Sequence, residues 1–128
     1  MSRSSNASRY GSLAEKRAAE KYGLRLDGVH TSWCDAEFGN GNPVEIKSAM
    51  HRRANGSPGR FRLFRTYHDR LLEADGYYCF VVYRIRGRGI EVLRTLMTKA
   101  SRLPSTTWYG AGGHRSSQQT KLCIDTVF

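Results

Sequence analysis

The sequence predicts an α/β (α+β) fold, with a central mixed β-sheet flanked by helices. Three observations predict it. Residues 11–23 have the pattern of a first helix, and residues 67–74 have that of a second. Short runs rich in β-branched and aromatic residues lie between and after them. The most apolar run, residues 77–85, is typical of a central strand that is covered on both faces. Helices and strands in this order form layers around a sheet.

The length and composition indicate one globular domain. The chain has 128 residues, and we expect a flexible basic tail at residues 1–9 followed by a single domain at 10–128. Hydrophobic residues make up 39% of the chain, and no run approaches the ~18 consecutive apolar residues of a membrane span. Three cysteines, odd in number and far apart, argue against a disulfide framework. We therefore expect a soluble protein in a reducing, cytoplasmic setting.

The charge balance indicates a polyanionic partner. Lysine and arginine number 21 against 11 acidic residues, which gives a formal net charge of +10. A solubilising surface is the alternative, but acidic residues serve solubility better than arginine does. A basic amphipathic helix, as expected of a membrane-surface protein, is absent from the pattern. Nucleic acid is the partner that this composition favours.

The first helix carries an acidic residue whose role stays open. Its residues are good helix formers, and Gly23 is placed to end it. Ser12 can act as the N-cap, and Glu15 three residues later would complete a capping box. Glu15 also lies on the apolar stripe of the helix, at helical spacing from Ala18, Ala19 and Tyr22. The glutamate is therefore either a cap or a site residue.

Residues 33–50, with the sequence WCDAEFGNGNPVEIKSAM, predict two short strands joined by a Gly/Asn turn. Strand side chains alternate between faces, so Glu45 and Lys47 share one face, and Val44 and Ile46 share the other. An exposed ion pair is the alternative for Glu45 and Lys47, and such pairs contribute only about 0–1 kcal/mol. Residues 24–31 predict a further short strand before this hairpin.

The loop of this hairpin decides which side chains meet. Residues directly opposite each other in an antiparallel pair point the same way. A three-residue loop over residues 39–41 places Asp35 opposite Glu45, whereas a two-residue turn at 40–41 places Asp35 opposite Ile46. We predict an odd loop or a bulge. Glu37 lies on the same face as Asp35 and is the alternative acidic partner.

The second half of the chain continues the alternation of helix and strand. Residues 51–60 predict an irregular basic loop, and residues 60–65 an extended piece with Arg60 and Arg62 on one face. Thr66 is expected to cap the second helix, whose inward residues are Leu71, Leu72 and Ala74. After the central strand we expect a returning strand at 90–95, a short helix at 97–103, a surface loop at 105–120 with Trp108 and Tyr109 packed, and a last strand at 121–128.

Several arginines follow the acidic hairpin directly. We expect them to contact phosphates, which position a nucleic-acid backbone without reading its sequence. A solvated basic loop is the alternative. The predicted DNA-binding residues, with one from the N-terminal tail, are Arg9, Arg52, Arg53, Arg60, Arg62 and Arg65.

Three motifs together carry a family resemblance. They are G-S-x-A-E on the first helix, an aspartate on a strand, and E-I-K-S shortly after it. The arrangement resembles the PD-(D/E)XK nuclease superfamily and is most similar to the archaeal Holliday-junction resolvases. The resemblance implies a restriction-endonuclease-like core and a metal-dependent DNA endonuclease, structure-selective for branched DNA. The alternatives are a non-catalytic DNA-binding domain with this fold, and a restriction- or repair-type nuclease that acts on duplex DNA.

The resemblance also implies roles for individual residues. Asp35 and Glu45, with the backbone carbonyl of Ile46, would bind Mg²⁺ or Mn²⁺, and Glu15 would complete the metal shell directly or through water. Lys47 would position or deprotonate the attacking water, or stabilise charge on the phosphate. Hard oxygen ligands of this kind suit Mg²⁺, which keeps several waters. Paired cutting of a junction needs two active sites, so a homodimer is expected, with its interface on residues 90–93 and the C-terminal strand.

Overall fold

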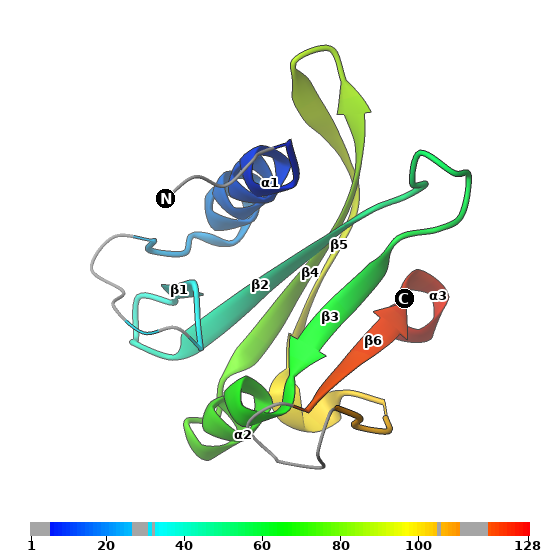
Figure 1. Cartoon of the computed structure of the whole chain (residues 1–128). Coiled ribbons are helices and arrows are strands. Elements are labelled where there is room, and N and C mark those ends of the chain that lie inside the picture. The colour runs from blue at the N-terminus through cyan, green and yellow to red at the C-terminus, as the bar shows by residue number, and fades with distance from the viewer. Residues whose placement is uncertain (1–5, 27–30, 32, 105, 111–117) are drawn as a thin grey trace.

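The computed structural model describes residues 6–26, 31, 33–104, 106–110 and 118–128 (Figure 1). In chain order its helices and strands are α1 (Asn6–Tyr22), β1 (Ala36–Glu37), β2 (Pro43–Met50), β3 (Arg60–Phe64), α2 (Arg65–Glu73), β4 (Tyr77–Arg86), β5 (Gly89–Lys99), the 3₁₀ helix η1 (Ala100–Arg102), β6 (Gln119–Cys123) and α3 (Ile124–Val127).

The predicted mixed sheet is confirmed. Four strands lie in the order β1-β2-β4-β5, with β2 parallel to β4 and the other neighbours antiparallel. Strand β4 is internal, and its residues 78–83 are all buried, as the apolar run predicted. Strands β3 and β6 form a separate antiparallel ribbon. Because β2 and β4 are parallel, the chain crosses between them through β3 and α2.

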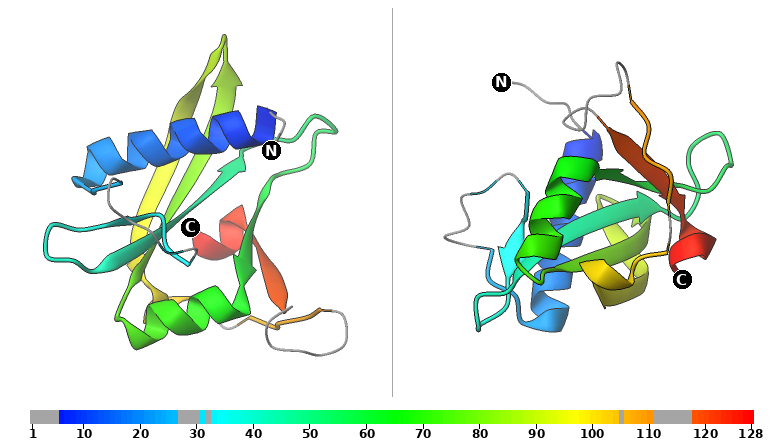
Figure 2. Two further views of the ribbon diagram at one scale, coloured as in Figure 1. Left: turned by 60° about the vertical axis from the view of Figure 1, so that its left-hand side comes forward. Right: turned by 90° about the horizontal axis from the view of Figure 1, so that it is seen from below.

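The sheet has an apolar layer on each face. Helix α1 lies across one face, and the β3–β6 ribbon with α2 covers the other (Figures 1 and 2). On the α1 side, Ala14 and Ala18 belong to one buried cluster with Val44 and Ile46 of β2. On the ribbon side, the second cluster includes Phe61, Leu63, Leu71, Tyr78 and Phe80. Side chains from alternate positions of β2 therefore reach two different cores.

Helix α1 begins earlier than predicted. It starts at Asn6, so residues 6–9 are helical, and the expected tail is reduced to residues 1–5, which lie outside the described residues. Ser12 is an exposed residue inside the helix, and the capping box with Glu15 was wrong. Tertiary contacts support the added turn: the Tyr10 and Tyr83 rings lie 6.4 Å apart, and the Arg9 guanidinium donates to the Arg88 carbonyl.

Helix α2 also differs in detail from the prediction. It begins at Arg65, and the residue at its N-cap position, Phe64, makes no side-chain capping bond, so Thr66 is not the cap. Leu71 is buried as predicted, but Leu72 and Ala74 are exposed. A helix of nine residues that touches the core along one narrow stripe buries only one of these positions.

Two other predicted elements differ from the structure, the first in kind and the second in its bounds. The helix expected at residues 97–103 is the continuation of β5 to Lys99 followed by η1, because Met97 and Lys99 pair with Cys79 and Tyr77 on β4. The last strand, expected at 121–128, runs from Gln119 to Cys123 and is followed by α3. Pairing with a neighbouring strand overrides local propensity in both places.

Two loop regions were predicted in part. Of the strand expected at 24–31, only Arg25 pairs, in an isolated bridge to Glu37, and residues 27–30 lie outside the described residues. Trp108 packs against the ribbon-side core, with its ring 5.5 Å from that of His68. Tyr109, expected to pack as well, is exposed.

A close backbone contact fixes the start of β3. The Gly59 N–H donates to the Met50 carbonyl at 3.0 Å, which closes the loop at residues 51–58. A Cβ atom at position 59 would lie 2.3 Å from the Met50 oxygen, so the contact requires glycine. The end of β2 and the start of β3 are therefore held together at this point.

None of the helices in the described part of the chain is long and apolar enough to cross a membrane.

Candidate active site

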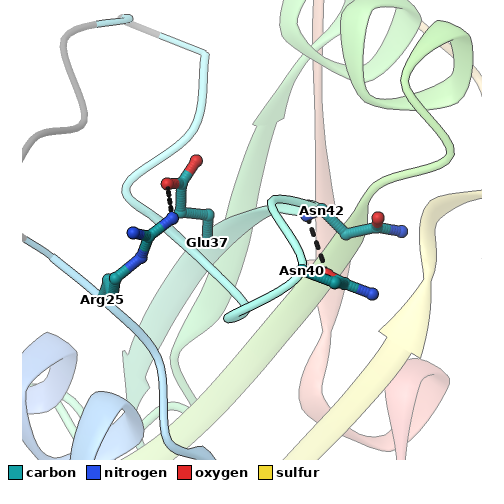
Figure 3. Close-up of polar contacts among 4 residues, drawn as sticks. All are labelled: Arg25, Glu37, Asn40 and Asn42. Carbon is teal, nitrogen blue, oxygen red and sulfur yellow. Dashed lines mark hydrogen bonds and ion pairs between the residues drawn. The ribbon is translucent and has the colours of Figure 1, made fainter.

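The β1–β2 hairpin has the three-residue loop that the predicted site requires. Ala36 pairs with Val44, and Phe38 N–H donates to the Asn42 carbonyl at 3.0 Å, which leaves residues 39–41 as the loop. Gly41 has a φ of 93°, which favours glycine. The Asn40 side chain accepts a hydrogen bond from Asn42 N–H at 3.0 Å and stabilises the turn (Figure 3). The predicted odd loop is confirmed.

Asp35 and Glu37 have different partners. Asp35 Oδ2 accepts a hydrogen bond from Ile46 N–H at 2.9 Å, and Asp35 N–H donates to the Val44 carbonyl at 2.9 Å. The Asp35 carboxylate is thus held against β2 beside Glu45. Glu37 forms an ion pair with Arg25 instead (Figure 3). Of the two acidic candidates, the structure brings Asp35 to Glu45.

Glu45 is a buried carboxylate with one unsatisfied oxygen. Its residue exposure is only 4%. Oε2 lies 3.3 Å from the Lys47 ammonium, while Oε1 is buried and has no hydrogen-bond partner among the described residues. Burial raises the pKa of Glu45 strongly, and the neighbouring Asp35 raises it further, while Lys47 opposes both. A buried oxygen without a partner is destabilising and calls for a cation or a proton.

Lys47 lies between the acidic cluster and the adjoining ribbon. Its side chain is 19% exposed, so the ammonium is shielded but reaches solvent. Nζ lies 5.3 Å from the centroid of the Phe64 ring, in the position of a cation–π contact. These contacts hold the ammonium at the boundary between Glu45 and the open side of the site.

Glu15 of α1 joins the same cluster. Burial raises the pKa of Glu15 to about 7, the negative charge of Asp35 contributes to the increase, and Lys47 reduces it. Asp35 and Lys47 both influence the pKa of Glu15, so Glu15 lies within electrostatic range of the hairpin residues although it comes from another element. The capping box is wrong, and the role of Glu15 as a site residue stays a prediction.

The residues fit a hard divalent cation held mainly by two carboxylates. The unpartnered oxygen of Glu45 and the adjacent Asp35 carboxylate are the donor type that Mg²⁺ and Mn²⁺ bind. Among the described residues, no three His, Cys, Asp or Glu side chains gather closely enough to hold a metal by themselves. Mg²⁺ sites commonly use one or two carboxylates with waters and substrate phosphate. Glu15 would then act through water, and the Ile46 carbonyl would be a further ligand.

A basic groove of about 730 Å³ adjoins Lys47. Three of the predicted DNA-binding residues line it, namely Arg53, Arg60 and Arg62. The groove residues that were not predicted include Tyr10 of α1 and Lys121 of β6. Lys121 is brought there by pairing with β3, and no local signal in the sequence indicates this long-range pairing.

The other predicted DNA-binding arginines lie elsewhere. Arg52 lines a second cavity of about 380 Å³, beside the end of β6. The Arg65 guanidinium donates to the Gln118 side chain. Arg9, bonded to the carbonyl of Arg88, does not line the groove. The arginines that follow the hairpin in sequence therefore do not form one surface. Some line the groove, Arg52 lines the second cavity, and Arg65 is hydrogen-bonded to Gln118.

Comparison with models of known families gives a match over residues 1–128 to the PD-(D/E)XK nuclease superfamily domain. Neither the curated proteins nor the solved structures give a match, so the similarity to archaeal Holliday-junction resolvases has no support from relatives. The mixed sheet flanked by helices agrees with the core of this superfamily. Membership implies a metal-dependent nuclease, a hydrolase that binds nucleic acid. With the family model covering the whole chain, the protein belongs to the PD-(D/E)XK nuclease superfamily.

Proposed function

We propose that the protein is a metal-dependent endonuclease that hydrolyses phosphodiester bonds in DNA, with Glu15, Asp35, Glu45 and Lys47 as its active site. One observation carries the proposal. One oxygen of buried Glu45 forms an ion pair with Lys47, and the other, which lies beside Asp35, has no hydrogen-bond partner among the described residues. A groove lined with arginines adjoins Lys47. A purely structural carboxylate would have both oxygens satisfied.

The chemistry divides between the cation and the protein. A bound Mg²⁺ or Mn²⁺ would polarise the phosphoryl oxygen and lower the pKa of an adjacent water. Asp35, oriented by Ile46 N–H, and Glu45 would hold the cation. The Lys47 ammonium, fixed by Glu45 Oε2, would position the attacking water and stabilise negative charge on the phosphate. The groove arginines would place the DNA backbone.

Selectivity for branched DNA is the finer part of the proposal. It is supported by the first-helix pattern of a glutamate shortly after a glycine, which resembles the junction resolvases. Paired cutting of a junction requires a homodimer. Of the residues suggested for the interface, Ile90 is buried within the chain, whereas Leu93 of β5 is 37% exposed and available for contact.

A cleavage assay tests the proposal. Purified protein is incubated with an end-labelled four-way junction or a linear duplex of matched sequence, in Mg²⁺, Mn²⁺ or EDTA. The variants are Glu45→Gln and Lys47→Ala, with Glu20→Gln, an exposed glutamate of α1, as the control. We expect metal-dependent cutting of the junction by the native protein and the control only.

The other outcomes are informative. Cleavage at the native rate by both site variants contradicts the site. Binding without cutting in any divalent metal identifies a non-catalytic DNA-binding domain. Equal cleavage of junction and duplex identifies a restriction- or repair-type nuclease and removes the branched-DNA part of the proposal.

A further inference from the structure

The β3–β6 ribbon has one face in the core and one face turned outward. Phe61 and Leu63 are fully buried, while Arg60 and Arg62, which alternate with them along β3, are exposed. Cross-strand partners share a face, and Arg62 is directly opposite Lys121. We call the residues Arg60, Arg62, Phe64 and Lys121, all of which line the groove, the outer ribbon face.

The outer ribbon face has three cationic side chains and no acidic ion-pair partner among the described residues. Like charges directly opposite each other destabilise a strand pair. Some cations elsewhere are compensated: Arg84 and Arg86 pair with Glu91 at 2.6 and 3.6 Å, and Lys99 pairs with Asp75 at 3.5 Å. None of the ion pairs among the described residues includes Arg60, Arg62 or Lys121. An anionic ligand bound to this face would offset the repulsion between Arg62 and Lys121.

Phe64 ends the cationic row on the side of the candidate active site. It is 36% exposed, with its ring 5.5 Å from that of Tyr67. The Lys47 ammonium lies 5.3 Å from its centroid, so the outer ribbon face is continuous with the active-site lysine. An exposed aromatic ring among cations suits a ligand that combines phosphates with flat apolar rings. Nucleic-acid strands have this composition.

We propose that the outer ribbon face binds an unpaired nucleic-acid strand, with Arg60, Arg62 and Lys121 contacting successive phosphates and Phe64 stacking on a base next to Lys47. An unpaired strand is specified because a duplex keeps its bases stacked inside, out of reach of Phe64. The inference rests on the proposed nuclease function and adds to it that the strand held beside the site is unpaired, which in a branched substrate requires base pairs to open at the branch point. Binding by mixed cationic and aromatic grooves is sequence-tolerant.

The phosphate contacts are tested by binding in EDTA, with a fluorescent oligothymidine and a duplex of equal length. The double variant Arg62→Gln/Lys121→Gln is compared with Arg25→Gln/Arg70→Gln, which removes the same charge from two arginines that have acidic partners. We expect the first to weaken single-strand binding about ten-fold, and its salt slope to fall by about 1.4, two contacts at about 0.7 each. If the double variant Arg62→Gln/Lys121→Gln binds with native affinity and native salt slope, the proposed phosphate contacts of the outer ribbon face are overturned.

The stacking contact is tested with Phe64→Leu, which keeps an apolar side chain but removes the ring. We expect about ten-fold weaker binding of oligothymidine, the effect of losing one stacked base. An abasic strand of the same length has the phosphates without the bases. The Phe64→Leu variant should therefore bind it as tightly as native protein does. Equal losses on both strands would overturn the stacking role. Native protein that binds duplex as tightly as the single strand would overturn the unpaired-strand assignment.

The binding tests and the cleavage assay fail independently. Oligothymidine binding in EDTA is measured without metal and without cleavage, so it reports on the outer ribbon face separately from the cleavage assay. A protein that binds oligothymidine through the outer ribbon face but cuts nothing refutes the nuclease proposal alone. If the native protein cuts DNA but the ribbon variants bind oligothymidine as tightly as it does, the proposed binding role of the outer ribbon face is refuted and the nuclease proposal stands.

Discussion

The two faces of strand β2 are buried to a similar degree but have opposite chemistry. Val44 and Ile46 are 0% and 6% exposed, and Glu45 between them is 4% exposed. The aliphatic pair packs against α1. Burying such a side chain stabilises the fold by about 1.5–3 kcal/mol. Glu45 does the reverse, because a buried carboxylate loses hydration. One strand therefore provides stability on one face and loses it on the other, which is the pattern of a site retained for function.

The sign of the Glu45 contribution follows from its pKa. The pKa in the folded protein lies above the ordinary value of 4.5, so the folded state binds this proton more tightly than the unfolded state. The stabilisation is complete below pH 4.5 and is lost as the pH rises toward the folded pKa. At neutral pH without metal, the charged face of β2 therefore lowers the free energy of unfolding.

The largest expected effect separates the two faces directly. Glu45→Gln keeps the shape of the side chain and removes its charge. We expect cleavage to fall by more than about 100-fold, the upper range for residues one shell beyond a metal. In EDTA at pH 7, the free energy of unfolding should be equal to or higher than that of the native protein. Cleavage rates and urea denaturation of the two proteins check this, and a fall in both quantities would contradict the comparison.

A second pair of variants tests which acid belongs to the charged face. Asp35→Asn should lower cleavage by at least about ten-fold, because Asp35 is held beside Glu45. Glu37→Gln removes only a surface ion pair with Arg25, worth about 0–1 kcal/mol, and cleavage should stay close to native. Cleavage rates of the two variants on the same substrate show which acid the reaction needs. The reverse order would assign the metal site to Glu37.

The apolar face should respond in stability alone. Val44→Ala removes buried methyl groups from the α1 side and should lower the free energy of unfolding by about 2 kcal/mol. Cleavage per folded molecule should be unchanged under conditions where the variant is folded. Val92→Ala, at a half-buried position of β5, is the control and should lose less. A large loss of activity in folded Val44→Ala would show that the two faces are not separable.

The smallest effect concerns a histidine behind the charged face. His68 Nδ1 lies 3.0 Å from the Tyr78 hydroxyl, and Tyr78 is the β4 partner of Glu45. Burial lowers the pKa of His68 below its ordinary value of 6.5. The unfolded state therefore gains a proton first, and the contribution of His68 to stability falls as the pH drops below 6.5. Glu45 contributes with the opposite sign over this range and does so in both proteins. From pH 7.5 to 5.5, the free energy of unfolding should therefore change more favourably for His68→Gln than for native protein, while His51→Gln, at an exposed position, should follow native protein.

The sequence predicted the parts of the molecule that local patterns determine. Alternation along residues 44–47 predicted the two faces of β2, and the odd hairpin loop that the site hypothesis required is the loop that places Asp35 beside Glu45. Helix starts were predicted poorly, because the first turn of α1 depends on Tyr10 meeting Tyr83 across the fold. The strand at 97–99 was mistaken for helix because its pairing with β4 is long-range.

The groove residues show the same contrast between local patterns, which the sequence reveals, and long-range pairing, which it does not. Arg60 and Arg62 were placed on one face by strand alternation alone, and the structure agrees. Lys121 was missed because β6 joins β3 from far along the chain. Arg65 was included because it is adjacent in sequence, but Gln118 accepts its hydrogen bond. Proximity in sequence therefore identified the region of the groove but not its full set of cations.

The contact between Gly59 and Met50 makes the intervening segment an exchangeable module. Residues 51–58 leave β2 and return at nearly the same point, so their length and composition can change without shifting Glu45, Lys47 or the start of β3. Arg52 and Arg53 lie in this segment and line the two cavities. Loop grafting that keeps Gly59 would thus replace Arg52 and Arg53 without moving Glu45 or Lys47.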